Sequence, residues 1–192
     1  MTNVLATLAY LIPSIGYCQG MNYVATALYT DSQNEELTFN LFLSLLHSKN
    51  LLPLYSNNLP DYHVKSFILE ALLRTYLPAL HNHFKRSIGL SHEVVTGQWI
   101  MTLFCGFFQY PSLVMFLDTF FLDGWLAFFR VALALLSRFK HELMANTDIA
   151  YVAQFFHTLR EKTGNLDIHE ILHDAIRGFQ GLNDEHLEIL ES

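Results

Sequence analysis

Residues 14–23 read SIGYCQGMNY, a short polar stretch with two glycines inside an otherwise apolar sequence. Before it, apolar residues recur at the spacing of one helix face until Pro13, which ends the run. After it, the same spacing returns in Met21, Val24, Ala25 and Leu28. The stretch therefore predicts a turn between two amphipathic helices, with the uncharged amide of Gln19 in the middle of that turn.

The helical spacing continues along most of the chain, and we predict an all-α domain of about eight to ten helices. Residues 51–59 with Pro60 are expected to form a loop, because Asn and Pro are frequent there. The helix after this loop is predicted to bury Val64, Phe67, Ile68, Ala71 and Leu72. Leu126 to His141 is apolar nearly all round and is predicted to be the central helix of the core.

Composition limits the classes of protein to which the chain can belong. The 192 residues are 52% hydrophobic and only 15% charged, which supports a packed core and excludes a disordered chain. The formal net charge is -7 and the basic residues are scattered, which argues against DNA, RNA or an anionic membrane as the primary ligand. Cys18 and Cys105 fit no disulfide framework, so we expect free thiols in a reducing, cytoplasmic compartment.

The longest uncharged segment, Val94 to Leu117, has the length of a membrane span. It also contains polar residues, and Tyr110-Pro111 divides it into two shorter pieces. We therefore expect two buried helices here rather than one helix that crosses a bilayer.

The sequence HEILH at 169–173 matches the helix pattern of zinc peptidases. His169 and His173 would share one helix face and bind the metal, with Glu170 as the base beside a zinc-bound water. Such a site needs a third ligand, for which the glutamates of the C-terminal tail lie at a suitable spacing. Since the same residues also fit an ordinary amphipathic helix, a zinc metallopeptidase is one alternative function.

Three segments resemble those of the TBC domain family, the GTPase-activating proteins for Rab-type GTPases. They are NVLATLAYLIPSIGYCQGMNYVATAL at 3–28, GQWIMTLFCGFF at 97–108 and MFLDTFFLDGWLAFFRVALALL at 115–136. Their order and spacing match the family, and the resemblance covers roughly residues 4 to 180. Leu117 stands where the family has a tryptophan.

The resemblance implies an all-helical fold and a role in membrane trafficking, as a regulator that activates GTP hydrolysis on a GTP-bound Rab rather than as an enzyme itself. The family supplies two side chains to the GTPase. One is an arginine finger that stabilises charge on the transferring phosphoryl group, and the other is a glutamine that orients the attacking water.

The family's Tyr-x-Gln signature corresponds to Tyr17-Cys18-Gln19 in this sequence. The resemblance therefore implies that Gln19 is the catalytic glutamine and that Tyr17, Gly16 and Gly20 bind the GTPase. An amide suits this role because it both donates and accepts hydrogen bonds. From the residues alone, Gln19 could instead cap the helix that follows it.

The family's arginine finger belongs to an Ile-x-x-Asp-x-x-Arg signature that precedes the glutamine signature. No such motif occurs in this sequence, whose first arginine is Arg74. We therefore expect residues 1–180 to form a partial Rab-GAP domain that is weak or inactive alone, followed by a partly ordered acidic tail at 181–192.

Further expectations concern partners. A partial domain is expected to expose apolar surface around Met21 to Leu46 and to self-associate. It is expected to use no cofactor or metal, and to reach endomembranes through a Rab whose identity the sequence does not give. A non-catalytic GTPase-binding or protein-binding module of the same fold is the second alternative function.

Overall fold

The computed structural model describes residues 2–89, 92–163 and 166–191, and within these ranges all regular structure is helical. The helices follow one another in this order: α1 (Thr2–Leu11), α2 (Met21–Ser32), α3 (Glu35–Ser48), α4 (Leu52–Tyr55), α5 (Pro60–Tyr76), α6 (Pro78–Asn82), the π-helix η1 (His83–Ile88), α7 (His92–Thr102), α8 (Ser112–Asp123), α9 (Trp125–Arg138), α10 (Lys140–Met144), α11 (Ile149–Thr163), α12 (Ile168–Gly178) and α13 (Asp184–Glu191). The prediction of an all-α fold is confirmed.

The predicted number of helices was too low, because short helices of one to two turns were missed. One of these, α4, lies within the predicted loop at 51–59. Its single turn buries Leu54 and Tyr55, and Leu51 just before it is also fully buried. Burial of these three side chains favours a helical turn over the extended loop that Pro and Asn suggested.

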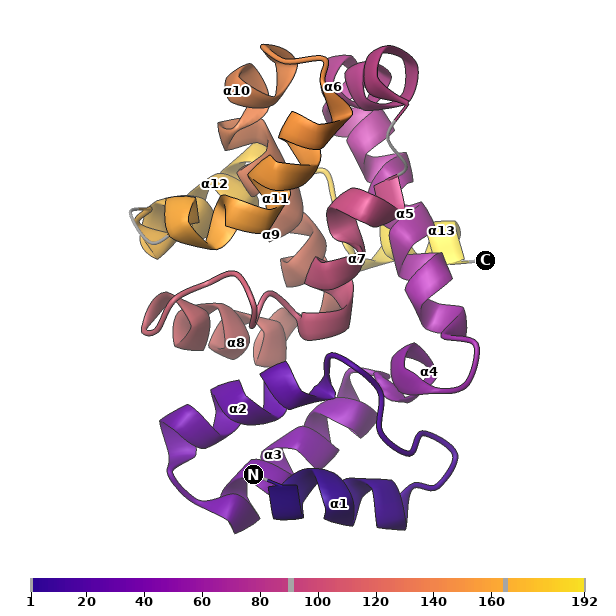
Figure 1. Ribbon diagram of the computed structural model, residues 1–192, viewed down its shortest axis with the longest axis vertical. Coiled ribbons are helices and arrows are strands. Elements are labelled where there is room, and N and C mark those ends of the chain that lie inside the picture. The colour runs from indigo at the N-terminus through magenta and orange to yellow at the C-terminus, as the bar shows by residue number, and fades with distance from the viewer. Residues whose placement is uncertain (1, 90–91, 164–165, 192) are drawn as a thin grey trace.

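The N-terminal helices form one layer and the rest of the chain a second (Figure 1). Helices α1, α2 and α3 pack on one another, and α4 leads from them to the long helix α5. In the second layer α9 contacts α5, α8, α10 and α12, and ten of its 14 residues are buried. The prediction of a central helix is confirmed, although the helix ends at Arg138 and α10 begins two residues later.

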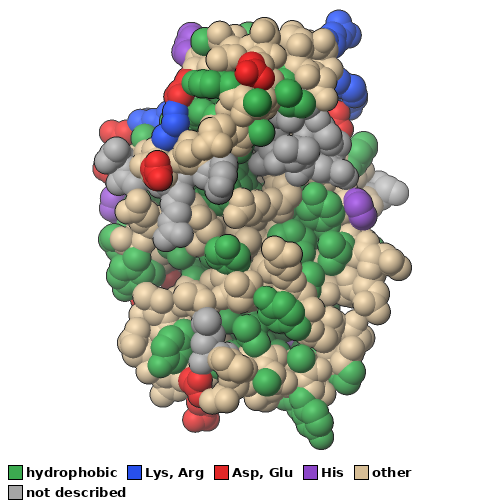
Figure 2. Space-filling view, viewed as in Figure 1, with side chains coloured by type: hydrophobic (Ala, Val, Ile, Leu, Met, Phe, Trp, Pro, Cys, Tyr) green, Lys and Arg blue, Asp and Glu red, His purple; other side chains and the backbone are tan. Residues whose placement is uncertain are grey.

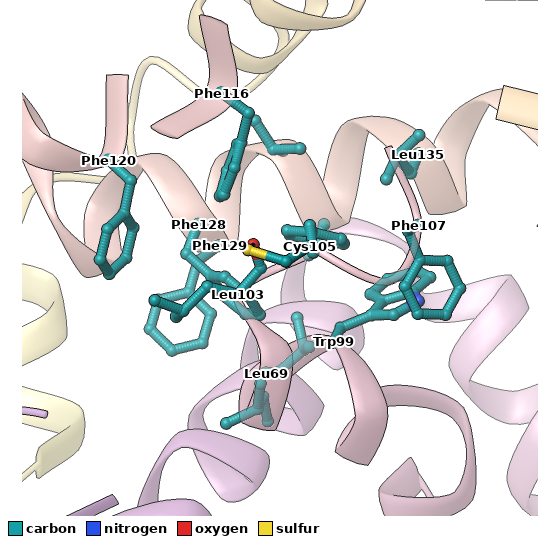
Figure 3. Close-up of a cluster of buried hydrophobic side chains, with 14 of the residues drawn as sticks. Leu69, Trp99, Leu103, Cys105, Phe107, Phe116, Phe120, Phe128, Phe129 and Leu135 are labelled. Atoms are coloured by element: carbon teal, nitrogen blue, oxygen red, sulfur yellow. Dashed lines mark hydrogen bonds between the residues drawn. The ribbon is translucent and has the colours of Figure 1, made fainter. Parts of the chain in front are cut away.

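An aromatic cluster joins α7, α8 and α9 (Figure 3). Phe104 lies in it and contacts Trp99, Phe116 and Phe128, with ring centroids 5.1, 5.2 and 4.8 Å away. Leu103 and Phe104 both have positive φ, of 48° and 58°, which ends α7 abruptly. Such backbone strain costs about 1–3 kcal/mol per residue, and the burial of two large side chains compensates it.

The long uncharged segment therefore forms α7, an irregular turn with a cis Tyr110-Pro111 bond, and α8. This confirms the expectation of two shorter helices. Among the described residues, none of the helices has the length and apolar character needed to cross a membrane.

The predicted inward face of α5 is partly wrong. Ile68, Ala71 and Leu72 are buried, but Val64 and Phe67 are 36% and 55% exposed. Lys65 is buried instead, since the first turns of α5 pack against α13 and Trp125. Its ammonium group lies 3.5 Å from Asp61 and 5.1 Å from the centre of the Trp125 ring, and it pairs with Glu191 of α13.

The expectation of exposed apolar surface around Met21 to Leu46 was wrong: most apolar side chains there are buried, because α1, α2 and α3 cover one another. Only Tyr23 and Leu37 are exposed among the large ones there. The most exposed apolar side chain of this layer is Tyr10, which is 82% accessible. At the other end of the chain the acidic tail forms α13, whose Leu187 is buried.

Candidate functional site

The turn between α1 and α2 begins just after the end of α1, where backbone hydrogen bonds cap the helix. The N–H groups of Ile15 and Gly16 both donate to the carbonyl oxygen of Ile12, at 3.0 and 3.2 Å. Gly16 has a φ of 60°, a left-handed conformation that glycine adopts without steric cost. The chain thus turns sharply away from α1 before Tyr17, whose side chain is 60% exposed.

Gly20 attaches this turn to α7. Its φ is 113°, and a Cβ at this position would overlap the carbonyl oxygen of Met101. The same carbonyl accepts a hydrogen bond from the Tyr55 hydroxyl at 3.1 Å. The contact between Gly20 and Met101 therefore fixes the turn against a part of the chain 81 residues away and leaves no room for a side chain.

Gln19 lies between these two glycines and does not cap α2. The cap position belongs to Gly20, which has no side-chain cap bond, and the Gly20 N–H donates to Asn22 Oδ1 at 3.3 Å. The Cys18 N–H donates to the sulfur of Met21, also at 3.3 Å. The Gln19 side chain is exposed, and its amide makes no hydrogen bond with any residue of the described ranges.

A groove of about 470 Å³ opens beside Gln19, and we call it the Gln19 groove. Its walls are the start of α2, the start of α5 and the C-terminal half of α7. The lining residues are Cys18, Gln19, Gly20, Tyr23, Leu59, Tyr62, Gly97, Gln98, Met101 and Thr102. None of these described side chains is normally charged, and burial raises the pKa of the Cys18 thiol, so the groove is neutral near pH 7.

The structure brings only part of the predicted site together. Gln19 and Gly20 line the groove, whereas Tyr17 and Gly16 lie before it on the turn. No arginine lines the groove among the described residues. Two arginines have partners elsewhere, since Arg130 donates to the Leu182 carbonyl and Arg138 pairs with Glu170, each at 2.5 Å.

The sequence analysis did not predict the other residues that line the Gln19 groove, of which Gln98 is the most important. This residue occurs in the GQW segment and is one of the polar residues within the uncharged run from Val94 to Leu117. An exposed glutamine within an apolar helix was the available signal. Its place in the same groove as Gln19 depends on how α7 packs against α2 and α5, which no local pattern encodes.

The HEILH residues lie on α12, where Glu170 pairs with Arg138. His169 and His173 are exposed and line a shallow pocket with the same arginine. In the part of the chain that the structure describes, no three His, Cys, Asp or Glu side chains gather as a metal site. A cationic guanidinium beside Glu170 also disfavours a bound metal ion there.

On the visible face of the molecule, Lys and Arg side chains appear together with Asp and Glu side chains in the upper part, over the end formed by α6, α10 and α11 (Figure 2). The lower part, over α1, α2 and α3, shows hydrophobic and neutral side chains with a few acidic ones. On this face, charged side chains of both signs are thus more frequent away from the N-terminal layer that carries the turn.

Comparisons with known proteins agree with this fold. The family model described as Rab-GTPase-TBC domain matches residues 1–144. The chain is 28% identical over 180 residues to "Rab GTPase-activating protein tbc-11" of Caenorhabditis elegans, covering 93% of this chain and 19% of that protein. It is 30% identical over 191 residues to "Small G protein signaling modulator 3" of Mus musculus, covering 98% of this chain and 24% of that protein.

The chain thus spans about a fifth of the length of the curated relatives it matches. Among solved structures, the crystal structure of the Ypt/Rab-GAP domain of Gyp1p is similar with a TM-score of 0.78 and 19% identity. That similarity covers 93% of this chain and 63% of the other, and at this identity it shows the fold.

Proposed function

This chain belongs to the Rab-GTPase-TBC domain family, and on that premise we propose that it binds a GTP-bound Rab-type GTPase and supplies Gln19 to GTP hydrolysis. The single observation that carries the proposal is the state of Gln19. Its amide is exposed, unbonded within the described residues, and placed at the mouth of a neutral groove. A bound Rab would also bring the chain to the membrane on which that Rab resides.

The amide can do what hydrolysis requires. Its carbonyl oxygen can accept a hydrogen bond from the attacking water while its N–H₂ group donates to an oxygen of the GTPase or nucleotide. Positioning and electrostatic stabilisation are the two main contributions that a protein makes to phosphoryl transfer, and Gln19 would supply the first. The Gly20–Met101 contact supports this role because it holds the turn against a packed helix, which limits the positions open to Gln19.

Tyr17 and Gly16 are proposed to contact the GTPase beside the groove. Tyr17 is exposed on the turn, and an aromatic side chain with a polar tip is a frequent anchor in protein interfaces. Gly16 has no atoms within 4 Å of a Cβ position, so a partner backbone can approach it closely. Both residues would therefore contribute to binding rather than to the chemical step.

We further propose that this chain alone accelerates hydrolysis weakly. No cationic side chain lines the Gln19 groove among the described residues, so the groove itself offers nothing to stabilise the charge on the transferring phosphoryl group. An arginine finger contributes on the order of 10³–10⁵ in rate. Full acceleration of GTP hydrolysis would then need an arginine from outside the residues that line the Gln19 groove.

Self-association is a separate proposal, and it rests on Tyr10 and Leu11, which are 82% and 55% exposed at the end of α1. Exposed apolar side chains of this size favour association. Sedimentation velocity at increasing concentration should detect a dimer that the double variant Tyr10→Ser, Leu11→Ser loses. A monomer at every concentration would contradict this proposal.

The central experiment compares the wild-type chain with Gln19→Ala against a panel of GTP-loaded Rab proteins. Single-turnover hydrolysis gives the rate, and titration with the GTP-loaded form gives the affinity. A third measurement is binding to the GDP-loaded Rab with aluminium fluoride, which mimics the transferring phosphoryl group. Gln180→Ala is the matched control, because Gln180 is also exposed and is also followed by a glycine.

We expect the wild type to bind one or more Rabs and to accelerate hydrolysis modestly. Gln19→Ala should lose that acceleration and the aluminium fluoride complex while keeping most of the affinity, and Gln180→Ala should behave as wild type. Equal rates for Gln19→Ala and wild type would refute the catalytic role. Binding without any acceleration would instead favour the non-catalytic module, and an acceleration above about a thousandfold would refute weak activity alone.

A further inference from the structure

We propose that Gln98 is a second recognition residue of the Gln19 groove, which binds an uncharged segment of the partner GTPase through its side-chain amide. This inference rests on the proposed function and deepens it. It assigns to Gln98 a role in the affinity for the GTPase, and leaves to Gln19 the role in the chemical step. Gln98 lies on α7, and it lines the same groove as Gln19.

The amide of Gln98 has room and no competing partner. The side chain is exposed, and within the described residues its amide makes no hydrogen bond. It extends past Gly106, where a Cβ would lie 3.5 Å from Gln98 Nε2 and 3.7 Å from a ring carbon of Tyr23. Gly106 therefore lies against both Gln98 and Tyr23 at the edge of the groove that these two residues line.

The backbone that carries Gln98 is firmly packed. The adjacent Gly97 lies so close to α5 that a Cβ there would be 2.7 Å from the Tyr62 hydroxyl oxygen. One turn later the Thr102 hydroxyl donates to the Gln98 carbonyl at 2.8 Å. A side chain on such a helix is well positioned for binding, because the packed backbone has little conformational freedom left to lose when the partner binds.

The chemistry of the groove points to a neutral polypeptide segment. A glutamine amide offers one acceptor oxygen and two N–H donors, so it can satisfy both the N–H and the C=O of a partner peptide group. The lining residues provide no charged group for an ionic partner. Each neutral hydrogen bond of this kind adds modestly to the binding free energy. A polar group that is buried in the interface without a hydrogen-bond partner weakens binding more strongly.

A neighbouring pocket beside α2 favours an extended segment over a single side chain. A second pocket of about 460 Å³ shares Tyr23 with the Gln19 groove. Its lining includes Asn22, Thr30 and Tyr110, which are again uncharged. A partner segment that binds Gln98 would pass Tyr23 and reach these polar side chains.

The two glutamines should therefore differ in what they control. A contact made equally in the ground state and in the transition state changes affinity and leaves the rate at saturation unchanged. A contact made only in the transition state changes the rate. Gln98 is assigned the first kind and Gln19 the second.

The test uses Gln98→Leu and Gln98→Ala in the full chain, with the GTP-loaded Rab that binds the wild type most tightly. Gln154→Leu is the matched control, because Gln154 is exposed on α11 and accepts a hydrogen bond from the hydroxyl of Thr158 at 3.0 Å, as Gln98 does from Thr102. Affinity and saturating hydrolysis rate are measured for each variant, together with the thermal unfolding midpoint.

Both Gln98 variants should weaken binding about 5- to 30-fold, with an unchanged saturating rate and an unchanged unfolding midpoint. This loss should be similar at low and high salt, since no charge is removed. Gln154→Leu should bind as wild type. Unchanged affinity in either Gln98 variant, or a loss of saturating rate instead, would overturn the assignment.

The outcome also separates this inference from the proposed function. If Gln19→Ala loses rate while Gln98→Leu binds normally, only the role of Gln98 is refuted. If no Rab binds the wild type, or if Gln19→Ala is as active as wild type, the proposed function fails. In the first of those two cases the Gln98 inference fails with it.

Discussion

The α-carbon of Gly20 packs directly against the carbonyl group of Met101, and this contact joins the turn that carries Gln19 to α7. The carbonyl has a second neighbour in the Tyr55 hydroxyl, which donates to it at 3.1 Å. Three segments distant in the sequence therefore meet at one peptide group. The position of Gln19 depends on a backbone contact that only glycine permits.

Gly20→Ala should consequently destabilise the protein more than Gly16→Ala. Both glycines have positive φ, but a Cβ at Gly16 has no atom within 4 Å while one at Gly20 overlaps the Met101 oxygen. We expect a loss of about 1 kcal/mol for Gly16→Ala and of at least about 2 kcal/mol for Gly20→Ala in urea unfolding. A larger loss at Gly16 would contradict the proposed packing.

Local pattern was sufficient for the fold class and for the longest helices, because the burial of one helix face repeats within a few residues. It was sufficient for α9, whose apolar residues extend nearly all round the helix. It failed for Lys65, since a lysine inside a helical pattern is normally assigned to solvent. Its burial depends on Asp61 and Trp125 and on Glu191 of the last helix, which is 126 residues away.

For the candidate site too, the sequence predicted some residues, while others depend on tertiary packing. The resemblance to a family singled out Gln19 from a short signature, and the two flanking glycines indicated a tight turn. Gln98 and Tyr62 could not be assigned to the same groove, because their place depends on the packing of α7 against α5. Convergence of three helices is a tertiary property, and it leaves no trace in the spacing of residues within any one of them.

Lys65→Met should be strongly destabilising. Methionine keeps the apolar stem that packs near Trp125 but leaves the largely buried Asp61 carboxylate without its cation. Removal of one partner from a buried ion pair costs about 3–5 kcal/mol, and because Glu191 is partly exposed we expect the lower half of this range.

Lys85→Met is the matched control for this change. Lys85 pairs with Glu70 at 3.3 Å, but its side chain is 67% exposed, so its loss should cost less than about 1 kcal/mol. Both variants are compared with the wild type by urea unfolding at pH 7. Similar losses for the two lysines would show that Lys65 is not a buried cation.

Asp61 should make stability depend on pH. Burial raises the pKa of this carboxyl above its ordinary value, and the nearby Lys65 ammonium only partly offsets the effect. Between the ordinary and the raised pKa the folded chain binds more protons than the unfolded chain, so stability falls as pH rises through that range and remains lower above it.

The wild type should therefore gain stability relative to Asp61→Asn as the pH is lowered from 7 to about 4, since the asparagine cannot titrate. The free energy of unfolding of both proteins, measured at several pH values in that range, checks this. Glu188→Gln, on the exposed side of α13, serves as a control for general acid effects. A constant difference between wild type and Asp61→Asn, or a difference of the opposite sign, would contradict the burial of Asp61.

Cys18 provides a reporter of the groove, because it lines the groove beside Gln19 and is only partly buried. Burial raises the pKa of its thiol, so alkylation near pH 7 should be slow but measurable, whereas Cys105 is buried and should react mainly through unfolding. A Rab that occupies the Gln19 groove should slow the alkylation of Cys18 several-fold.

Mass spectrometry of iodoacetamide-treated samples, with and without the GTP-loaded Rab, measures the alkylation of both cysteines in one experiment. The GDP-loaded Rab is the control for a non-specific effect. Equal Cys18 rates with and without a Rab that demonstrably binds would place the GTPase elsewhere on the molecule. Protection of Cys18 by the GTP form alone would instead link the occupied groove to the nucleotide state that Gln19 is proposed to act on.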